Sequence, residues 1–404
     1  MPPLSNIRVL DLSRVFAGPY TTQLLADLGA EVIKVERPRQ GDDMRGYGPP
    51  FLKDREGKDT SESSYYLAAN RNKKGITIDF SQAEGRDLIL KLAKRADVLV
   101  ENYKVGDLAR YGLGYTDLKA VNPGIVYCSV TGFGQTGPYK QRPGLDGTIQ
   151  AMGGMMSLTG DPDGPPQRVG IVAADFTTAM YSAVAILSAL YHRDAQGGQG
   201  QYIDMALLDV QVAMLSHRAL HYFVSGQVPK RVGTGTPASV PSQTFPCSDG
   251  DVFLSAATDP QFERLCHKVI GRPGLLDDPR FRTRLDRFHN KPALIGILNP
   301  LMQAQSMKHW VETCEAANIV CSPVNNLAQV FEDEQVLARE MVVKVEHAKA
   351  DDLRLVRNPI RLSETPITDY AAPPTMGQHT DEVLRDELGL DAAEIARLRA
   401  AGIV

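Results

Sequence analysis

The sequence of 404 residues predicts an α/β protein built on a parallel sheet that carries helices on its faces. Strand-like and helix-like segments alternate through the first third of the chain, and such alternation is typical of parallel sheets. Loops rich in glycine and basic residues follow the strand-like segments. A stretch rich in Gly, Pro and Ser at 226–251 then predicts a crossing into a second domain.

The first strand-like segment is 7–13, and the helix predicted after it covers 18–30, beginning near Gly18-Pro19 and ending at Gly29. The segments predicted next are strands at 31–36, 75–80, 97–102 and 124–134 and a helix at about 83–95. The loops that follow four of the strands are 14–19, 37–43, 103–112 and 131–138. At the carboxyl edge of a sheet such loops suit a phosphorylated ligand. The chain has no GxGxxG after the first strand and no GxxxxGK[ST], which excludes a standard dinucleotide fingerprint and a P-loop.

A single carboxylate, Asp175, precedes an uncharged stretch that begins at Phe176. The stretch of about 16 residues predicts a buried helix and is shorter than the roughly 20 residues that a membrane span needs. Asp175 has two interpretations. It is either the N-cap of this helix, which Asp favours, or a nucleophile or base at a helix N-terminus beside small residues.

The second region begins with a strand at 252–257. Helical patterns follow near 259–270, 291–304 and 307–317, then a strand-like run at 319–324. The tail from about 330 predicts a helical start, a polar strand region near 341–362 and two short helices at the end.

Composition and motifs exclude several classes of protein. The net charge of −4 gives no basic field for nucleic acid. The five scattered cysteines form no metal-binding spacing and are expected to be reduced. His217 and His221 are four residues apart, but no third metal ligand is visible nearby. No GxSxG motif and no targeting segment is found, so we expect a soluble cytoplasmic protein with no membrane partner.

Several segments together resemble one known family. They are VLDLSRVFAGPYTTQLLADLGAEVIKVERP, NKKGITIDF, VLVENYKVGDLARYGLGY, VYCSVTGFGQTGP and GQHTDEVL, and they span nearly the whole chain. The chain resembles the class III CoA-transferases, which include formyl-CoA transferase, carnitine CoA-transferase and the α-methylacyl-CoA racemases. NRNKKG, QVAMLSH and KRVGTGTPASVPSQTFP further resemble the branch that uses succinyl-CoA and dicarboxylates such as glutarate.

The resemblance implies a fold and an assembly. It implies a large Rossmann-like, CoA-binding domain made from both chain ends, 1–225 and 326–404, with a smaller α+β domain inserted at 226–325. It also implies a homodimer in which two ring-shaped subunits interlock.

The resemblance places the family's nucleophile on Asp175, where the helix N–H groups and dipole are expected to keep the carboxylate ionised. It implies CoA transfer through an aspartyl anhydride and an aspartyl-CoA thioester, with CoA as substrate and no permanent cofactor or metal. The implied CoA contacts are Phe16, Ala17, Arg37, Ile78, Asp79, Phe80, Ser81, Asn102, Tyr103, Lys104, Arg110, Thr131, Gly132, Phe133 and Gly134. Arg14 and Thr131 replace a His and a Lys of formyl-CoA transferase, which weakens those two contacts.

Alternatives remain at this point. An acyl-CoA racemase needs a second proton carrier, but Leu145 replaces the His of the racemases' GHD motif. A silent CoA-binding protein would lack Asp175, and a thioesterase would only need water at the anhydride. The acceptor is open among C4–C5 dicarboxylates such as glutarate or itaconate, with Arg71 or Arg231 as candidate partners of its second carboxylate.

Overall fold

The computed structural model describes residues 1–237 and 239–404. Ala238, within the stretch expected to separate two domains, lies outside the described residues. The chain divides into two compact units, which are described separately. The first contains 1–155, 168–220 and 337–404, so it includes both chain ends, and the second contains 156–167 and 221–336.

The first unit is organised around a six-stranded sheet in which every neighbouring pair of strands is parallel. In spatial order the strands are β5 (Lys73–Thr77), β2 (Glu31–Glu36), β1 (Arg8–Asp11), β6 (Val98–Glu101), β7 (Val126–Thr131) and β8 (Tyr202–Ala206). The parallel sheet predicted from the sequence is therefore confirmed. If the six strands are numbered along the chain, their spatial order is 3-2-1-4-5-6. The order of strands therefore runs one way from β1 to β5 and the other way from β6 to β8. In open α/β sheets, ligands bind at this switch point between β1 and β6.

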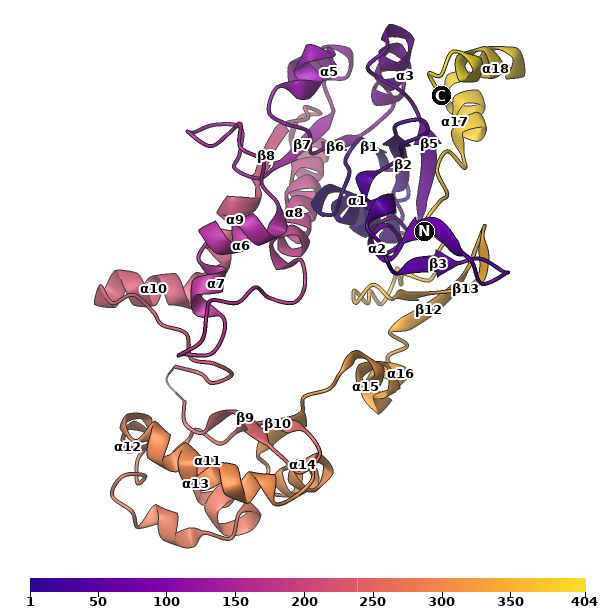
Figure 1. Ribbon diagram of the computed structural model, residues 1–404. Coiled ribbons are helices and arrows are strands. Elements are labelled where there is room, and N and C mark those ends of the chain that lie inside the picture. Colours follow the sequence, from indigo (N-terminus) through magenta and orange to yellow (C-terminus); the bar gives the residue numbers. More distant parts are fainter. Residues whose placement is uncertain (238) are drawn as a thin grey trace. The chain divides into compact units, whose positions relative to one another are not determined.

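Helices cover both faces of this sheet, because successive side chains of each strand point to opposite sides (Figure 1). In β1, Leu10 belongs to one hydrophobic core and Val9 to the other. The first core includes residues of α3 (Ala83–Ala93), α5 (Tyr115–Val121), α17 (Thr380–Leu388) and α18 (Ala392–Ala400). The second includes residues of α1 (Ala17–Asp27), α6 (Asp146–Met152), α8 (Ala173–Gln196) and α9 (Leu207–Met214).

Helix α8 corrects one expectation. It has 24 residues, because it continues through His192 and Arg193, and by length and composition it is able to cross a membrane. Half of its most apolar window is buried inside the protein, where Ala174, Ile186 and Leu190 pack in the second core. The packing explains the apolar composition, since a core helix of a globular protein passes the same test.

Smaller elements complete the chain outside the sheet. They are the 3-10 helix Asp43–Gly46, β3 (Phe51–Lys53), β4 (Asp59–Ser63), α2 (Ser64–Ala69), α4 (Asp107–Arg110), α7 (Met155–Leu158), α10 (Ser216–Ser225), α15 (Leu327–Glu332), α16 (Glu334–Ala338), β12 (Val342–His347) and β13 (Ala350–Val356). The hairpin β12–β13 lies within the polar strand region predicted near 341–362.

The second unit contains an antiparallel sheet ordered β11 (Val320–Pro323), β10 (Asp251–Ser255) and β9 (Ser242–Pro246). Its helical segments are α11 (Asp259–Arg264), a π turn at Leu265–Val269, the 3-10 helix Pro273–Leu276, α12 (Arg284–His289), α13 (Lys291–Gln303) and α14 (Met307–Ala316). A core of its own, with Phe245, Phe262 and Trp310 among its members, holds these elements together.

Candidate active site

Asp175 lies in the first turn of α8 but does not cap the helix. The N-cap position belongs to Val172, whose side chain makes no capping hydrogen bond, and Asp175 is the third helical residue. The interpretation of Asp175 as an N-cap is therefore wrong. A carboxylate in the first turn still lies near the positive end of the helix dipole.

A second carboxylate, Asp146, accepts hydrogen bonds from free backbone N–H groups of this turn. Its Oδ2 accepts hydrogen bonds from the backbone N–H of Ala174 at 2.9 Å and of Asp175 at 3.4 Å. Burial, and after it the negative charge of Asp146, raises the pKa of Asp175 to about 7. With a pKa near 7 the carboxyl group is only partly ionised at neutral pH, whereas full ionisation was expected at the helix terminus. The N–H groups that would stabilise the charge already serve Asp146.

A cavity of about 220 Å³ opens beside Asp175. The predicted contacts that line it together with Asp175 are Phe16, Ala17, Asn102, Tyr103, Lys104, Thr131 and Gly132. These residues come from the loops after β1, β6 and β7 and from the start of α1. The reversal point of the sheet therefore lies directly at the candidate nucleophile.

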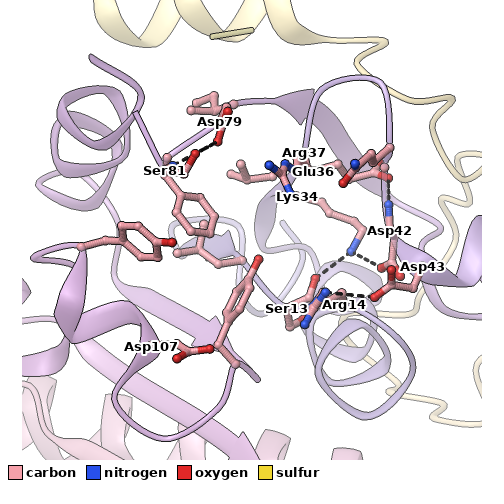
Figure 2. A pocket seen from close by; sticks show the side chains of 18 of the residues that line it. Ser13, Arg14, Lys34, Glu36, Arg37, Asp42, Asp43, Asp79, Ser81 and Asp107 are labelled. Carbon is pink, nitrogen blue, oxygen red and sulfur yellow. Dashed lines mark hydrogen bonds and ion pairs between the residues drawn. The ribbon is translucent and has the colours of Figure 1, made fainter. Parts of the chain in front are cut away.

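A neighbouring cavity of about 310 Å³ lies over the loop after β2 (Figure 2). The predicted contacts that line it are Arg37, Ile78, Asp79, Phe80, Ser81, Tyr103 and Arg110. Arg14 and Tyr103 line both cavities, so the two spaces meet at these side chains. An elongated ligand is able to reach from Arg37 at one end to Asp175 at the other.

Two predicted contacts, Phe133 and Gly134, line neither of these cavities. Phe133 packs edge-on against Tyr139, with ring centroids 5.8 Å apart. The N–H of Gly134 donates to Oγ1 of Thr131 at 2.9 Å. In this structure both residues shape the loop after β7 and do not face the open space.

The loop between β1 and α1 forms the shared wall of the two cavities, and it is strained. Val15 has φ of 66°, which a β-branched residue rarely adopts. The N–H of Val15 donates to Oδ1 of Asp42 at 3.0 Å, and that of Arg14 donates to Oδ1 of Asn102 at 2.9 Å. Asn102 therefore has a structural role in addition to the predicted contact. Strain held by several partners is frequent at functional sites.

A buried ion pair between Lys34 and Asp42 holds this loop in place (Figure 2). Nζ of Lys34 donates to the carbonyl oxygen of Ser13 and to Oδ2 of Asp42, both at 2.9 Å. Burial alone would lower the pKa of Lys34, but the carboxylates of Asp42, Asp11 and Glu36 outweigh it and the pKa is raised. Lys34 therefore keeps its positive charge although it is buried at the edge of the larger cavity.

The loop after β2 is held by a second buried cluster. Arg45 bonds both oxygens of Glu36, each at 2.7 Å, and also pairs with Glu62. Its guanidinium lies 3.7 Å from the centre of the Tyr66 ring. This cluster holds Gly41 and Asp42, which line the larger cavity, in place.

The basic segment 69–75 does not supply free positive charge. Arg71 is bonded through two nitrogens to the carboxylate of Asp27, and Lys73 pairs with Asp11 at 3.0 Å. Arg71 is 4% exposed and lines neither cavity, so it does not fit the role of an acceptor-binding residue at this site. Arg231, the other candidate, lies in the second unit and donates to backbone carbonyls there.

The cavity at Asp175 contains residues that sequence reasoning missed. Lys140 and Arg142 line it and pair with no carboxylate in the described part of the chain. The guanidinium of Arg142 stacks 3.8 Å from the ring centre of Tyr139. Lys140 and Arg142 follow the strand predicted at 124–134, and the loops after the other predicted strands also contain basic residues. This shared position could have identified them as candidates from the sequence.

Within residues 1–237 and 239–404 the structure has no group of three or more His, Cys, Asp or Glu side chains able to hold a metal ion. Among the residues lining the cavity, Asp175 is the single acid, and Leu145, whose side chain is unable to carry a proton, lines it as well. The chemistry that this cavity offers is therefore that of one carboxylate among cationic, neutral polar and apolar side chains.

Comparison with known proteins identifies the class. The model of CoA-transferase family III matches residues 4–380. The chain is 42% identical to a succinate–glutarate CoA-transferase of Agrobacterium fabrum, over 95% of this chain and 96% of the relative. It is 40% identical to the human succinyl-CoA:glutarate CoA-transferase, over 100% of this chain and 90% of the relative. A crystal structure of a CAIB/BAIF family protein from Brucella suis superposes with a TM-score of 0.87 at 41% identity, covering 95% of this chain and 99% of that chain. This protein therefore belongs to CoA-transferase family III and is an enzyme of that class.

Proposed function

We propose that the enzyme moves CoA from succinyl-CoA to a C4–C5 dicarboxylic acid such as glutarate or itaconate, with Asp175 as the nucleophile. The observation that carries the proposal is Asp175 in a cavity lined otherwise by cationic, neutral polar and apolar residues. The names of the two relatives support this donor and this class of acceptor, because each name contains glutarate together with succinate or succinyl-CoA.

The reaction follows from what one carboxylate is able to do. An oxygen of Asp175 attacks the thioester carbonyl, the C–S bond breaks, and CoA leaves as the thiolate. The thiolate attacks the aspartyl carbonyl of the resulting anhydride and releases succinate. The acceptor carboxylate then attacks the aspartyl-CoA thioester, and the thiolate leaves again. Its attack on the acceptor carbonyl of the second anhydride forms the new thioester and frees Asp175.

The two adjoining cavities suit a CoA thioester. Arg37 and Arg110 in the larger cavity and Lys104 beside Asp175 match the charge of the CoA phosphates. Tyr103, which lines both spaces, marks the route from the nucleotide end to the thioester end. The other contacts implied by the resemblance that line the cavities are proposed as CoA contacts on the same ground. Phe133 and Gly134 are proposed to act through the loop that carries Thr131.

The distal carboxylate of the dicarboxylate needs a cationic partner near Asp175. Lys140 and Arg142 fit this requirement, because they line the nucleophile's cavity and carry no carboxylate partner in the described residues. Arg142 is preorganised by its stacking on Tyr139. Both the succinyl group of the donor and the glutaryl group of the product carry such a carboxylate, so one subsite serves both half-reactions.

The proposal includes an interlocked homodimer in the cytoplasm, with CoA as a substrate and no resident cofactor. Large apolar side chains that remain exposed support a partner copy: Val184 is 63% exposed, Tyr191 74%, Phe223 73% and Val224 85%. The five cysteines form no disulfide, which suits a reducing compartment. Light scattering on the purified protein tests the dimer.

The central test is an exchange assay read by mass spectrometry. The enzyme, succinyl-CoA and glutarate should yield glutaryl-CoA and succinate. Hydroxylamine should attack the activated aspartyl carbonyl, release CoA or the carboxylate, and leave a hydroxamate on the peptide that contains Asp175. Asp175→Ala should lose both signals while CoA binding remains. The matched control is Asp209→Ala, because Asp209 is likewise the third residue of a helix, α9, and is exposed. Turnover that persists in Asp175→Ala would refute the mechanism, and wild-type enzyme that forms no new thioester with any dicarboxylate would refute the function.

A further inference from the structure

We propose that Asp146 is a positioning residue of the transfer reaction, which fixes the first turn of α8 and controls the charge on Asp175. The inference rests on the proposed role of Asp175 as the nucleophile. It assigns a function to a residue that touches neither of the two cavities.

The contact geometry is the first support. Asp146 is the first residue of α6 and is 6% exposed. Its Oδ2 accepts from the N–H groups of Ala174 and Asp175, at 2.9 and 3.4 Å. Helix α8 has no capping side chain of its own at Val172. Asp146 therefore caps α8 from another helix, and the side chain of Asp175 is left free of that task.

The orientation of Asp146 is itself fixed, which separates it from an ordinary mobile surface carboxylate. Nε2 of Gln150, one turn further along α6, donates to Oδ1 of Asp146 at 2.7 Å. Oε1 of the same Gln150 accepts from the N–H of Val169 at 3.0 Å, just before α8 begins. The two side chains thus tie α6 to the segment that leads into the nucleophile.

The electrostatic consequence follows from the same contacts. Asp146 is a negative group next to Asp175, while the charged side chains that line the cavity, Arg14, Lys104, Lys140 and Arg142, are all positive. Burial contributes most to the raised pKa of Asp175, and Asp146 contributes after it. A carboxylate with a raised pKa is more basic and hence a better nucleophile once it is ionised.

Asp146 also links the nucleophile to the opposite wall of its cavity. The residue directly before it, Leu145, lines that cavity, as do Lys140 and Arg142 in the same loop. Asp146 therefore joins the end of the loop that carries Leu145 to the first turn of α8, which carries the nucleophile. Such preorganisation is what an acyl-transfer site requires.

The test replaces the charge but keeps the acceptor. In Asp146→Asn, the amide oxygen is still able to accept from Ala174, while the amide nitrogen replaces the oxygen that accepts from Gln150 and the negative charge is gone. We expect the pKa of Asp175, measured by NMR of its ¹³C-labelled carboxyl carbon and assigned with Asp175→Asn, to fall by on the order of one unit. It should stay above its ordinary value because burial remains. The acid limb of kcat for transfer should move to lower pH by the same amount, with the KM for succinyl-CoA unchanged.

Controls separate this role from a structural one. Asp391→Asn removes the capping carboxylate of α18, which accepts from the N–H of Glu394 at 2.8 Å, and should leave the pKa of Asp175 unchanged. Asp146→Ser, also neutral and able to accept a hydrogen bond, is the second variant if the first does not fold. An unshifted pKa of Asp175 in a folded neutral variant overturns the inference. The NMR titration gives this answer even if the wild-type enzyme transfers no CoA, an outcome that would refute the proposed function alone.

Discussion

Replacing the nucleophile by its neutral isostere should make the protein more stable. The pKa of Asp175 is raised to about 7 in the folded protein, above the ordinary aspartate value of 3.8. An unfolded chain therefore loses this proton near pH 4, while the folded chain keeps it up to about pH 7. The free energy of unfolding therefore falls as the pH rises from about 4 to about 7. Above pH 7 the wild-type protein bears the full free-energy cost of ionising Asp175 in its folded environment. Asp175→Asn carries no such cost.

The magnitude follows from the size of the shift. The difference between 3.8 and about 7 is slightly more than three units, and each unit corresponds to about 1.36 kcal/mol. The variant should thus gain up to about 4 kcal/mol at pH 8, which for a chain of 404 residues corresponds to a rise in Tm of roughly 5 °C. At pH 4 the gain should fall to about half a kcal/mol, because the unfolded carboxyl group is then still partly ionised, and it should vanish only at lower pH.

Thermal unfolding at one scan rate, from pH 4 to pH 8, measures this gain for Asp175→Asn against the wild type. Asp209→Asn, which changes the exposed third residue of α9, is the control and should follow the wild type at every pH. A gain that does not depend on pH, or no gain at pH 8, would show that Asp175 is not held in an environment that disfavours its charge.

Three further perturbations address the rest of the site. Arg37→Ala should weaken CoA binding by roughly tenfold or more, since a charge-assisted contact contributes about 1.5–3 kcal/mol; calorimetry that shows equal affinity would remove Arg37 from the site. Arg45→Ala removes the ion-pair partner of buried Glu36 and leaves Glu62 with Lys349 alone, and it should cost about 3–5 kcal/mol in urea unfolding, whereas an unchanged midpoint would contradict the role given to that cluster. Replacing Lys140 and Arg142 together by Gln should raise the KM for glutarate and reduce the preference for glutarate over a monocarboxylate of equal length, and a preserved preference would place the distal carboxylate elsewhere.

Much of the fold could be read from local patterns. β1, β2, β6 and β7 lie within the predicted strand segments, because short runs of Val, Ile and Leu between polar loops bury on both faces of a parallel sheet. β8 was not separated from the helix that follows it, since YIDMA continues directly into the apolar residues of α9. The extent of α8 was also missed, because His192 and Arg193 lie in its last turns, where charge does not end a helix.

In the candidate site, too, some features could be predicted from motifs and others depend on tertiary packing. Motif likeness named Phe16, Asn102 and Lys104, which line one cavity because loops after neighbouring parallel strands meet at one edge of the sheet. It could not show that Arg71 is committed to Asp27 or that Asp146 holds the turn of Asp175. These pairs are 44 and 29 residues apart and depend on how helices pack.

The sequence by itself determined the class of this protein, its parallel sheet and the identity of the lone carboxylate. Those features depend on residue type, short-range periodicity and contiguous motifs. Only the tertiary structure decided the raised pKa of Asp175, the commitment of the basic segment to buried ion pairs, and the placement of Lys140 and Arg142 at the nucleophile. A pKa or a free cation is a property of the surroundings of a side chain, and packing brings those surroundings together from distant parts of the chain.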